Sequence, residues 1–345
     1  MMGRKTTFLL AFSTLGCGPA ITEAPGDEIG ESAGSSESAD ADTSESASSD
    51  SSSESADVDT SEESTSEAES TTAESTTMSE SESATTQTSE GPSDCFSDED
   101  CELGNCLEGE CVQVDSCRQL AELDTNDTLP DGVYELDDEG TGYAAYCDMT
   151  TAGGGWTLVL KSDGNADTFR YASAQWGSPD PFQPEFADLD RREAKLASYA
   201  SVPFDALRIG MEAPFGVDPA PLALNWIELP VTADSLHALI GPGMQVATSI
   251  GRDTWKSLVA GASLQPNCNL EGFNLAPSRN LVHHRVRIGI VANEQDNCDS
   301  PNSRLGIGGD GNVCATSPNA TGNFAGCGGD NGDVNLIGFG VVFVR

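Results

Sequence analysis

Basic residues are missing from a long part of this chain: no lysine or arginine occurs between Lys5 and Arg118. No aromatic residue occurs between Phe12 and Phe96. A stretch that is so polar, and that carries charge of one sign, cannot bury enough apolar surface to offset the conformational entropy lost on folding. We therefore expect a hydrophobic core only from about residue 115 onward, which leaves room for one folded domain.

Positive charge is scarce in the chain as a whole. Its 345 residues include 16 Lys and Arg against 57 Asp and Glu, which gives a formal net charge of −41. Nucleic acid repels such a polyanion, so the composition excludes nucleic-acid binding. The acidity suits the binding of cations, and it equally suits the simpler task of keeping a tether extended and soluble.

Histidine and the usual catalytic motifs are scarce too. The chain contains three histidines, and two of them, His283 and His284, are neighbours in an expected strand. Their side chains would point to opposite faces and could not share one metal ion. No nucleophile elbow, metalloprotease histidine pair or phosphate-binding glycine loop with its lysine is present. We predict that the protein is not an enzyme.

No segment has the length and apolarity of a transmembrane helix. The short apolar run Phe8–Phe12 follows Arg4 and Lys5, as in an export signal. Thr14-Leu15-Gly16-Cys17 resembles the lipobox of bacterial lipoproteins, in which the cysteine is lipidated. We expect residues 1–17 to be a signal segment and Cys17 to anchor the exported protein to an outer membrane or cell surface. The alternative is an ordinary signal cut near Ala20, which would leave the protein secreted without an anchor.

Residues 18–93 are dominated by Ser, Glu, Thr, Ala and Asp. They show no apolar periodicity of either the helical or the strand kind. We expect a disordered acidic stalk with a mean span of about 45 Å, which like-charge repulsion would extend further. Such a stalk would lift a folded head off a surface.

The cysteines indicate an oxidising compartment. Apart from Cys17, ten remain, enough for five disulfides. Residues 94–114 are too few to form a core, so two disulfides must hold this module, in one of three possible connectivities. Zinc is the rival explanation, which the spacing and the exported context disfavour. The cysteines of this module are Cys95, Cys101, Cys106 and Cys111.

Residues 115–345 carry the tryptophans, the tyrosines and the long apolar patterns. Val282, His284, Val286, Ile288 and Ile290 alternate with other residues at period two, as in a strand with one buried face. We predict an α+β domain with long loops. The expected strands are 132–136, 143–148, 156–161, 206–211, 223–229, 281–291 and 337–344, and the expected helices are 232–240, capped by Thr232 or Asp234, and 253–260.

The beginning of this domain resembles a fibrinogen C-terminal domain. The resemblance rests on four motifs that follow one another with family-like spacing: Cys117, Gly132-Val133-Tyr134, Tyr146-Cys147-Asp148-Met149 and Gly153-Gly154-Gly155-Trp156-Thr157. It implies short twisted antiparallel sheets with a few short helices and a disulfide between Cys117 and Cys147.

The second half resembles the intelectin branch, through Asn293-Glu294, Ile307-Gly308-Gly309 and Cys327-Gly328-Gly329-Asp330. That resemblance implies a cell-surface recognition protein that binds glycans. The aromatic residues that intelectins place around the sugar are missing, because no Trp follows Trp255 and no Tyr follows Tyr199. Phe324 or Phe339 would have to supply the apolar wall. A head that binds a surface protein is the alternative.

Three loops rich in Gly, Asn and Asp offer the oxygen ligands that calcium prefers. Both related families bind calcium in this part of the domain, so we predict at least one calcium site. Ordinary Asx turns are the alternative. The predicted ligands are Asp310, Asp330 and Asp333, followed by Asp296, Asp299 and Asn312. Chain proximity favours disulfides between Cys268 and Cys298 and between Cys314 and Cys327.

Overall fold

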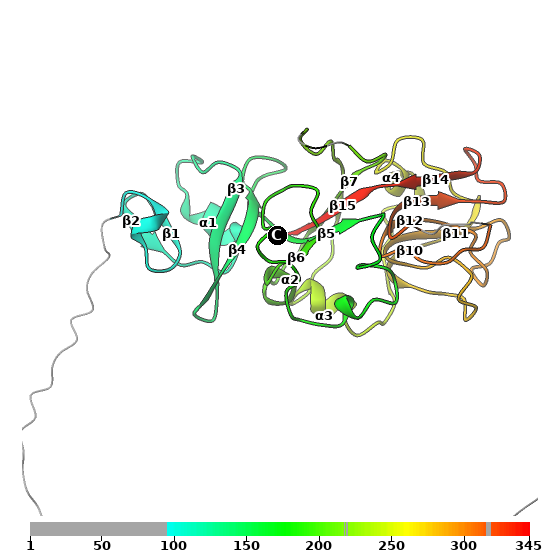
Figure 1. Ribbon diagram of the computed structural model, residues 1–345, viewed down its shortest axis with the longest axis horizontal. Coiled ribbons are helices and arrows are strands. Elements are labelled where there is room, and N and C mark those ends of the chain that lie inside the picture. Colours follow the sequence, from blue (N-terminus) through cyan, green and yellow to red (C-terminus); the bar gives the residue numbers. More distant parts are fainter. Residues whose placement is uncertain (1–94, 217, 219, 315–318) are drawn as a thin grey trace, which may run out of the picture. The chain divides into compact units, whose positions relative to one another are not determined.

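The computed structural model describes residues 95–216, 218, 220–314 and 319–345. The predicted signal segment, its lipidation site Cys17 and the predicted stalk lie outside these residues. Among the residues that the structure describes, no helix is long and apolar enough to cross a membrane. A short hairpin module, residues 95–114, precedes a head built on two antiparallel sheets (Figure 1).

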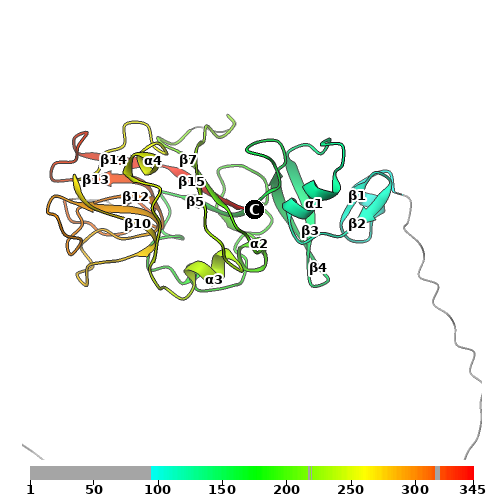
Figure 2. The same ribbon diagram turned by 180° about the vertical axis from the view of Figure 1, so that it is seen from behind.

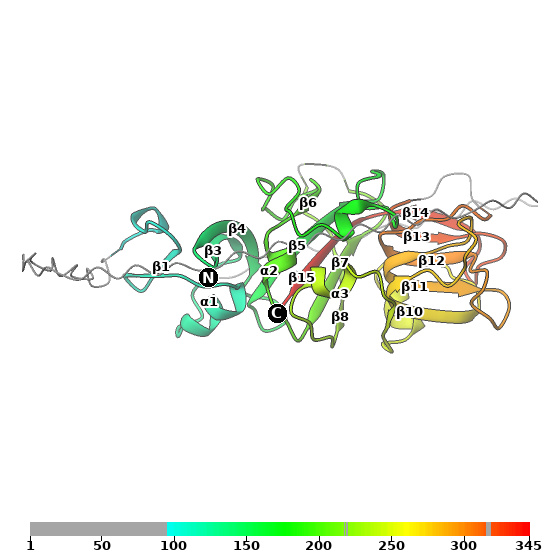
Figure 3. The same cartoon turned by 90° about the horizontal axis from the view of Figure 1, so that it is seen from below.

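Seven strands form the first sheet, in the order β3, β4, β5, β15, β7 and β8, with β6 paired to β5. The last strand, β15, lies between β5 and β7 (Figure 3). Its side chains alternate between two buried clusters, one on each face of the sheet, so a continuous apolar run is expected there. The strands are β3 (Gly132–Asp138), β4 (Thr141–Asp148), β5 (Trp156–Asp163), β6 (Ala194–Lys195), β7 (Leu207–Glu212), β8 (Asn225–Leu229) and β15 (Phe339–Val344).

Six strands form the second sheet, in the order β14, β13, β12, β11, β10 and β9. Strands that follow one another in the chain are neighbours in the sheet, which therefore is a meander (Figures 2 and 3). The strands are β9 (Val246–Ala247), β10 (Asn267–Leu275), β11 (Val286–Asn293), β12 (Ser303–Ile307), β13 (Thr321–Ala325) and β14 (Val334–Ile337).

A row of glycines crosses the second sheet. Gly272 pairs with Gly289, Gly289 with Gly306, and Gly306 with Gly322. A Cβ atom added at any of the four would lie between 2.0 and 2.2 Å from a carbonyl oxygen of the neighbouring strand. The strands thus approach one another more closely than any side chain allows, and only glycine fits this row.

The predicted strand 337–344 proves to be two strands in different sheets. β14 ends at Ile337 and β15 begins at Phe339. Gly338 lies between them, donates its N–H to the Thr321 carbonyl (3.0 Å) and accepts from the Gly164 N–H (2.9 Å). The chain therefore passes from one sheet to the other within a single residue, which an apolar run does not reveal.

The helices are short, so the head is an α+β fold in which sheet dominates. The expected helix 232–240 begins only at Leu236, with Ser235 as its cap through a bond from the Ala238 N–H (3.0 Å). Residues 232–234 are not helical because Ala233 forms a β-bridge with Phe204. The helices are α1 (Cys117–Leu123), α2 (Ser198–Ser201), α3 (Leu236–Ile240) and α4 (Arg252–Lys256), with 3-10 turns η1 (Asp98–Asp100) and η2 (Ala174–Trp176).

The expected strands of the first sheet lie within two residues of their observed starts, whereas β10, β12, β13 and α1 were not expected. The expected strand 281–291 starts only at Val286, so the prediction that His283 and His284 lie on a strand is wrong. Cys117 pairs with Cys147, Cys268 with Cys298 and Cys314 with Cys327, and these three predictions are confirmed. In the module, Cys95 pairs with Cys106 and Cys101 with Cys111.

Candidate functional site

Three segments meet at one end of the second sheet, which we call the loop end. They are the β11–β12 loop (294–302), the β13–β14 loop (326–333) and the segment 263–266 that enters β10. Disulfides tie two of these segments to others, through Cys268–Cys298 and Cys314–Cys327. Of the predicted calcium ligands, this end contains Asp296, Asp299, Asp330 and Asp333.

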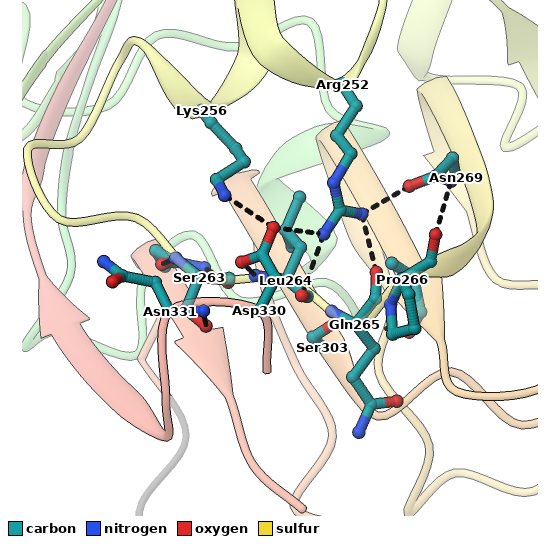
Figure 4. A network of polar contacts seen from close by, with 12 residues as sticks. Arg252, Lys256, Ser263, Leu264, Gln265, Pro266, Asn269, Ser303, Asp330 and Asn331 are labelled. Carbon is teal, nitrogen blue, oxygen red and sulfur yellow. Dashed lines mark hydrogen bonds and ion pairs between the residues drawn. The ribbon is translucent and has the colours of Figure 1, made fainter. Parts of the chain in front are cut away.

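Asp330 is the centre of a charged network at the loop end (Figure 4). Its Oδ2 atom accepts hydrogen bonds from Arg252 Nη2 (2.8 Å) and Lys256 Nζ (2.7 Å). Both cations come from α4, where residues four apart share a face. The Oδ1 atom accepts from the Leu264 N–H (3.1 Å). Burial opposes ionisation of Asp330, but the bonds from Arg252 and Lys256 outweigh it and hold the pKa of this carboxyl well below its usual range.

Arg252 also fixes the segment that enters β10. Its guanidinium donates to the carbonyls of Leu264 (2.8 Å) and Gln265 (2.6 Å) and to Asn269 Oδ1. Gln265 is fully buried and donates from Nε2 to the carbonyls of Gly326 (2.8 Å) and Cys327 (3.2 Å). The network thus joins α4, β10 and the β13–β14 loop into one framework.

Two buried oxygens at the loop end have no hydrogen-bond partner, Gln265 Oε1 and Asn293 Oδ1. Asn293 donates from Nδ2 to the Asn297 carbonyl (3.1 Å) and to Ser300 Oγ (3.4 Å), so its amide faces the β11–β12 loop. A buried oxygen without a donor costs about 1–3 kcal/mol. Each therefore has room for one more interaction, with water or with a cation.

The other end of β12 holds the remaining predicted ligands. Asp310 forms an ion pair with Arg285 (2.6 Å), and Asn312 donates its N–H to the Val282 carbonyl (2.8 Å). Burial opposes ionisation of Asp310, but the hydrogen bond from Arg285 dominates the remaining effects and lowers the pKa of Asp310. Beyond the Ile288–Ile307 pair, the ladder of β11 and β12 continues to a bridge between Arg285 and Asp310. Asp310 therefore lies at the end of the sheet opposite to the β11–β12 loop.

The predicted calcium donor set is therefore not assembled. Asp310 and Asp330 are each neutralised by cationic side chains, and they belong to different networks. Asp333 accepts from the Gly328 N–H (2.8 Å). Within the described part of the chain, one group of three metal-ligating side chains has donor atoms within 4.8 Å of one another. That group consists of cysteines, not carboxylates. The predicted trio of Asp310, Asp330 and Asp333 does not fit a calcium ion.

A buried arginine that the sequence did not single out organises the face of β12. Arg304 Nη2 donates to the Asn319 carbonyl (2.7 Å), and its Nη1 donates to His284 Nδ1. His284 Nε2 donates to the Val313 carbonyl (3.0 Å), and the imidazole stacks on Phe324. Burial, followed by the charge of Arg304, lowers the pKa of His284 to about 2. His284 is therefore neutral with both nitrogens engaged, and it is not a metal ligand.

A hollow of about 270 Å³ lies beside β13 and β14, next to the loop end. The ring of Phe324 is 5% exposed and borders this hollow, whereas Phe339 is fully buried in the core. Both phenylalanines considered for an apolar wall are therefore buried, and of the two it is Phe324 that lines this hollow. The lining residues are Cys314, Phe324, Ala325, Gly326, Asp333, Val334 and Asn335.

Comparison with known proteins supports the first resemblance. No family model matches the chain. A 73-residue segment is 38% identical to Veficolin-1 of Varanus komodoensis, and it covers 21% of this chain. The match spans 32% of that relative, so the chain corresponds to about a third of its length. The fibrinogen-like globe domain of human ANGPTL6 shares 20% identity over 30% of this chain and 45% of that chain, with a TM-score of 0.21, which is too low to support an argument.

The similarity to Veficolin-1 is confined to this 73-residue segment of the chain. The five disulfides agree with an extracellular, oxidising environment.

Proposed function

We propose that the protein is a non-enzymatic recognition protein outside the cell, and that its head binds glycans in the hollow beside β13 and β14. The observation that carries this proposal is the lining of that hollow, to which Phe324 and Asn335, partners in the register of β13 and β14, contribute together with the exposed Asp333. An aromatic ring covers the apolar face of a sugar, while carboxylate and amide groups bind its hydroxyls. Intelectin-like recognition of sugar hydroxyls is the closest model for such a site.

The proposal includes the anchor and the stalk. A lipid on Cys17 would hold the protein at an outer membrane or cell surface, and residues 18–93 would carry the head away from it. The alternative partner is a surface protein. Leu281 (66% exposed) and Val282 (42% exposed) support that alternative because they form an exposed apolar pair just before β11.

Glycan binding predicts a specific loss in an Asp333→Asn variant. Asp333 is exposed and accepts a hydrogen bond from the Gly328 N–H, which an asparagine oxygen can also accept, so the fold should tolerate the change. A hydrogen bond from a sugar hydroxyl to a carboxylate contributes about 1.5–3 kcal/mol, so affinity should fall about 10- to 100-fold. A glycan array, followed by titration of the best ligand, measures the effect.

The matched control is Glu228→Gln, which removes an exposed carboxylate from β8 in the other sheet. Its affinity should equal that of the parent protein. Equal binding by all three proteins, or binding only to protein ligands that a Leu281→Ser variant loses, would favour the protein-binding alternative.

Calcium is the cofactor that we propose for this head, at the β11–β12 loop rather than at Asp310 or Asp330. Asp296 and Asp299 are exposed carboxylates of that loop, and Asn293, whose Nδ2 donates to the Asn297 carbonyl of the loop, has a buried Oδ1 without a hydrogen-bond partner among the described residues. Carboxylate and amide oxygens on a flexible loop are the ligands that calcium takes.

Isothermal titration with calcium tests this assignment. We expect one calcium ion per chain, loss of the binding heat in Asp299→Asn, and unchanged heat in Asp330→Asn, whose carboxylate Arg252 and Lys256 already occupy. Absence of heat in the parent protein would end the calcium proposal, and loss of heat only in Asp330→Asn would return the site to the β13–β14 loop.

A further inference from the structure

The four cysteines of the N-terminal module gather their sulfur atoms in one place. The Sγ atoms of Cys95, Cys101 and Cys111 all lie within 4.8 Å of one another. Cys106 is bonded to Cys95 and stands directly opposite Cys111 across the hairpin of β1 (Asn105–Leu107) and β2 (Glu110–Val112). The two disulfides are therefore neighbours, and four sulfurs form a single cluster at the module's centre.

Hydrogen bonds, rather than disulfides, hold this module against the head. The buried Asn105 side-chain amide forms two hydrogen bonds with the backbone of Glu135, as a neighbouring strand would. Its Nδ2 donates to the Glu135 carbonyl (2.7 Å), and its Oδ1 accepts from the Glu135 N–H (3.1 Å). The Asp137 N–H donates to the Val114 carbonyl (2.8 Å). The module thus lies along the outer edge of β3, an edge strand of the first sheet, through hydrogen bonds that involve no sulfur atom.

Two carboxylates hold the loop that carries Cys95 and Cys101. Asp100 Oδ2 accepts from the N–H groups of Phe96 (2.8 Å) and Ser97 (3.0 Å). Asp98 Oδ1 accepts from the Cys106 N–H (2.7 Å), which joins this loop to the hairpin. None of these hydrogen bonds involves a sulfur atom, so we expect them to keep the four thiols near one another after the bridges are reduced.

We infer that the reduced module is a binding site for one thiophilic divalent cation of the zinc type, held by Cys95, Cys101, Cys106 and Cys111. Zinc–sulfur bonds of about 2.3 Å place the sulfurs of a tetrahedral site about 3.8 Å apart. To reach that geometry, each bonded pair of sulfurs, now 2.06 Å and 1.99 Å apart, must separate, while the distances among Cys95, Cys101 and Cys111 that span the two bridges are already no more than 4.8 Å. The exposed carboxylates of Asp98, Glu99 and Asp100 raise the local concentration of cations.

The disulfide form and the metal form exchange through a balanced reaction. Each disulfide takes two electrons and two protons from a dithiol reductant, which becomes a disulfide itself. The thiols then release their protons as the cation binds, because thiolates are the ligands. Thiol–disulfide exchange with an external disulfide, which takes two electrons per bridge together with two protons and becomes thiols, re-forms both bridges and releases the ion. The oxidising environment favours the bridged form, so metal binding marks places where a dithiol reductant reaches the chain.

Cobalt provides the test because tetrahedral thiolate coordination gives Co²⁺ intense visible and near-ultraviolet absorption. The full chain is reduced with a dithiol, desalted under nitrogen, and titrated with Co²⁺ and then Zn²⁺. We expect one Co²⁺ per chain with the tetrahedral spectrum, and its displacement by Zn²⁺. The spectrum should disappear in Cys101→Ser/Cys111→Ser and persist in the matched variant Cys314→Ser/Cys327→Ser, which removes the exposed disulfide of the head.

Three results would overturn the inference. One is a full count of free module thiols by alkylation without any tetrahedral spectrum. Another is an unchanged spectrum in Cys101→Ser/Cys111→Ser, which would assign the metal to head cysteines. The last is resistance of both module bridges under conditions that open Cys314–Cys327. Thermal unfolding of each variant confirms that the head, whose Cys117 and Cys147 are fully buried, stays folded.

Discussion

Replacing Gly306 with alanine is expected to destabilise the head by about 3 kcal/mol or more. A Cβ atom at this position would lie 2.0 Å from the Ile288 carbonyl oxygen and 2.7 Å from the Gly289 Cα atom. Both obstacles are backbone atoms of β11, which no rotamer change can move away. The φ angle of Gly306 is +145°, a conformation that other residues rarely adopt, so backbone strain adds to the clash. Urea or thermal unfolding measures the loss.

Gly132→Ala is the matched control for this prediction. Gly132 also lies in a strand, β3, but a Cβ atom there meets nothing within 4 Å and its φ is not in the left-handed region. Its stability should change by no more than about 0.5 kcal/mol. If Gly306→Ala were as stable as Gly132→Ala, the strands of the second sheet could not be as close as the glycine row requires.

The second large effect is expected from Glu212→Gln. Glu212 ends β7 and forms a two-point ion pair with Arg191, with both N–O distances 2.7 Å and both side chains 6% exposed. The Gly216 and Ala223 N–H groups also donate to its carboxylate at 3.0 Å. The amide would leave the nearly buried Arg191 charge with Asp218 (2.9 Å) as its remaining carboxylate partner. Removal of one partner from such a pair costs about 3–5 kcal/mol at pH 7.

The same pair predicts a distinct response to acid. Hydrogen bonds from Arg191 lower the pKa of Glu212 to about 2. A carboxyl whose pKa is lower in the folded state stabilises the protein above its unfolded pKa of about 4.3, and this stability is lost as the pH falls toward 2. Unfolding of the parent protein between pH 7 and 2 should therefore show a decline below about pH 4.3 that is shallower in Glu212→Gln.

The control variant is Glu228→Gln, whose carboxylate is exposed on the neighbouring strand β8. It should match the parent protein in stability at pH 7 and in its acid limb. Parallel acid limbs for the parent and Glu212→Gln would show that the Arg191–Glu212 pair does not govern acid stability.

Local patterns predicted the parts of the fold that local chemistry decides. The strands around the Cys117–Cys147 disulfide and the Gly153–Trp156 bend were expected because alternation, turns and a family motif coincide there. The strands β12 and β13 were not expected, since Gly306 and Gly322 interrupt their apolar patterns. Those glycines serve close contact between strands, a property that only the pairing partner reveals.

The residues of the candidate site were likewise predictable from the sequence, whereas their interaction partners were not. The Asp and Asn residues of the glycine-rich loops indicated, from the sequence, which side chains offer oxygen ligands. Their partners were not visible: Arg252 and Lys256 reach Asp330 from more than seventy residues away, and Arg285 reaches Asp310 from twenty-five. Whether an aspartate is a free ligand depends on which cations face it, and chain distance does not encode that.

The amino-acid sequence by itself determined the presence of a disulfide-held module, the three disulfide pairings of the head and the strands at its start. Each of these follows from composition or from contacts among residues close in the chain. Tertiary structure alone decided the exchange of sheets at Gly338, the neutralisation of Asp310 and Asp330, and the convergence of four sulfurs in the module. These depend on distances between segments that are joined only by folding, because hydrogen bonds and ion pairs act over a few ångströms in space, whatever the separation along the chain.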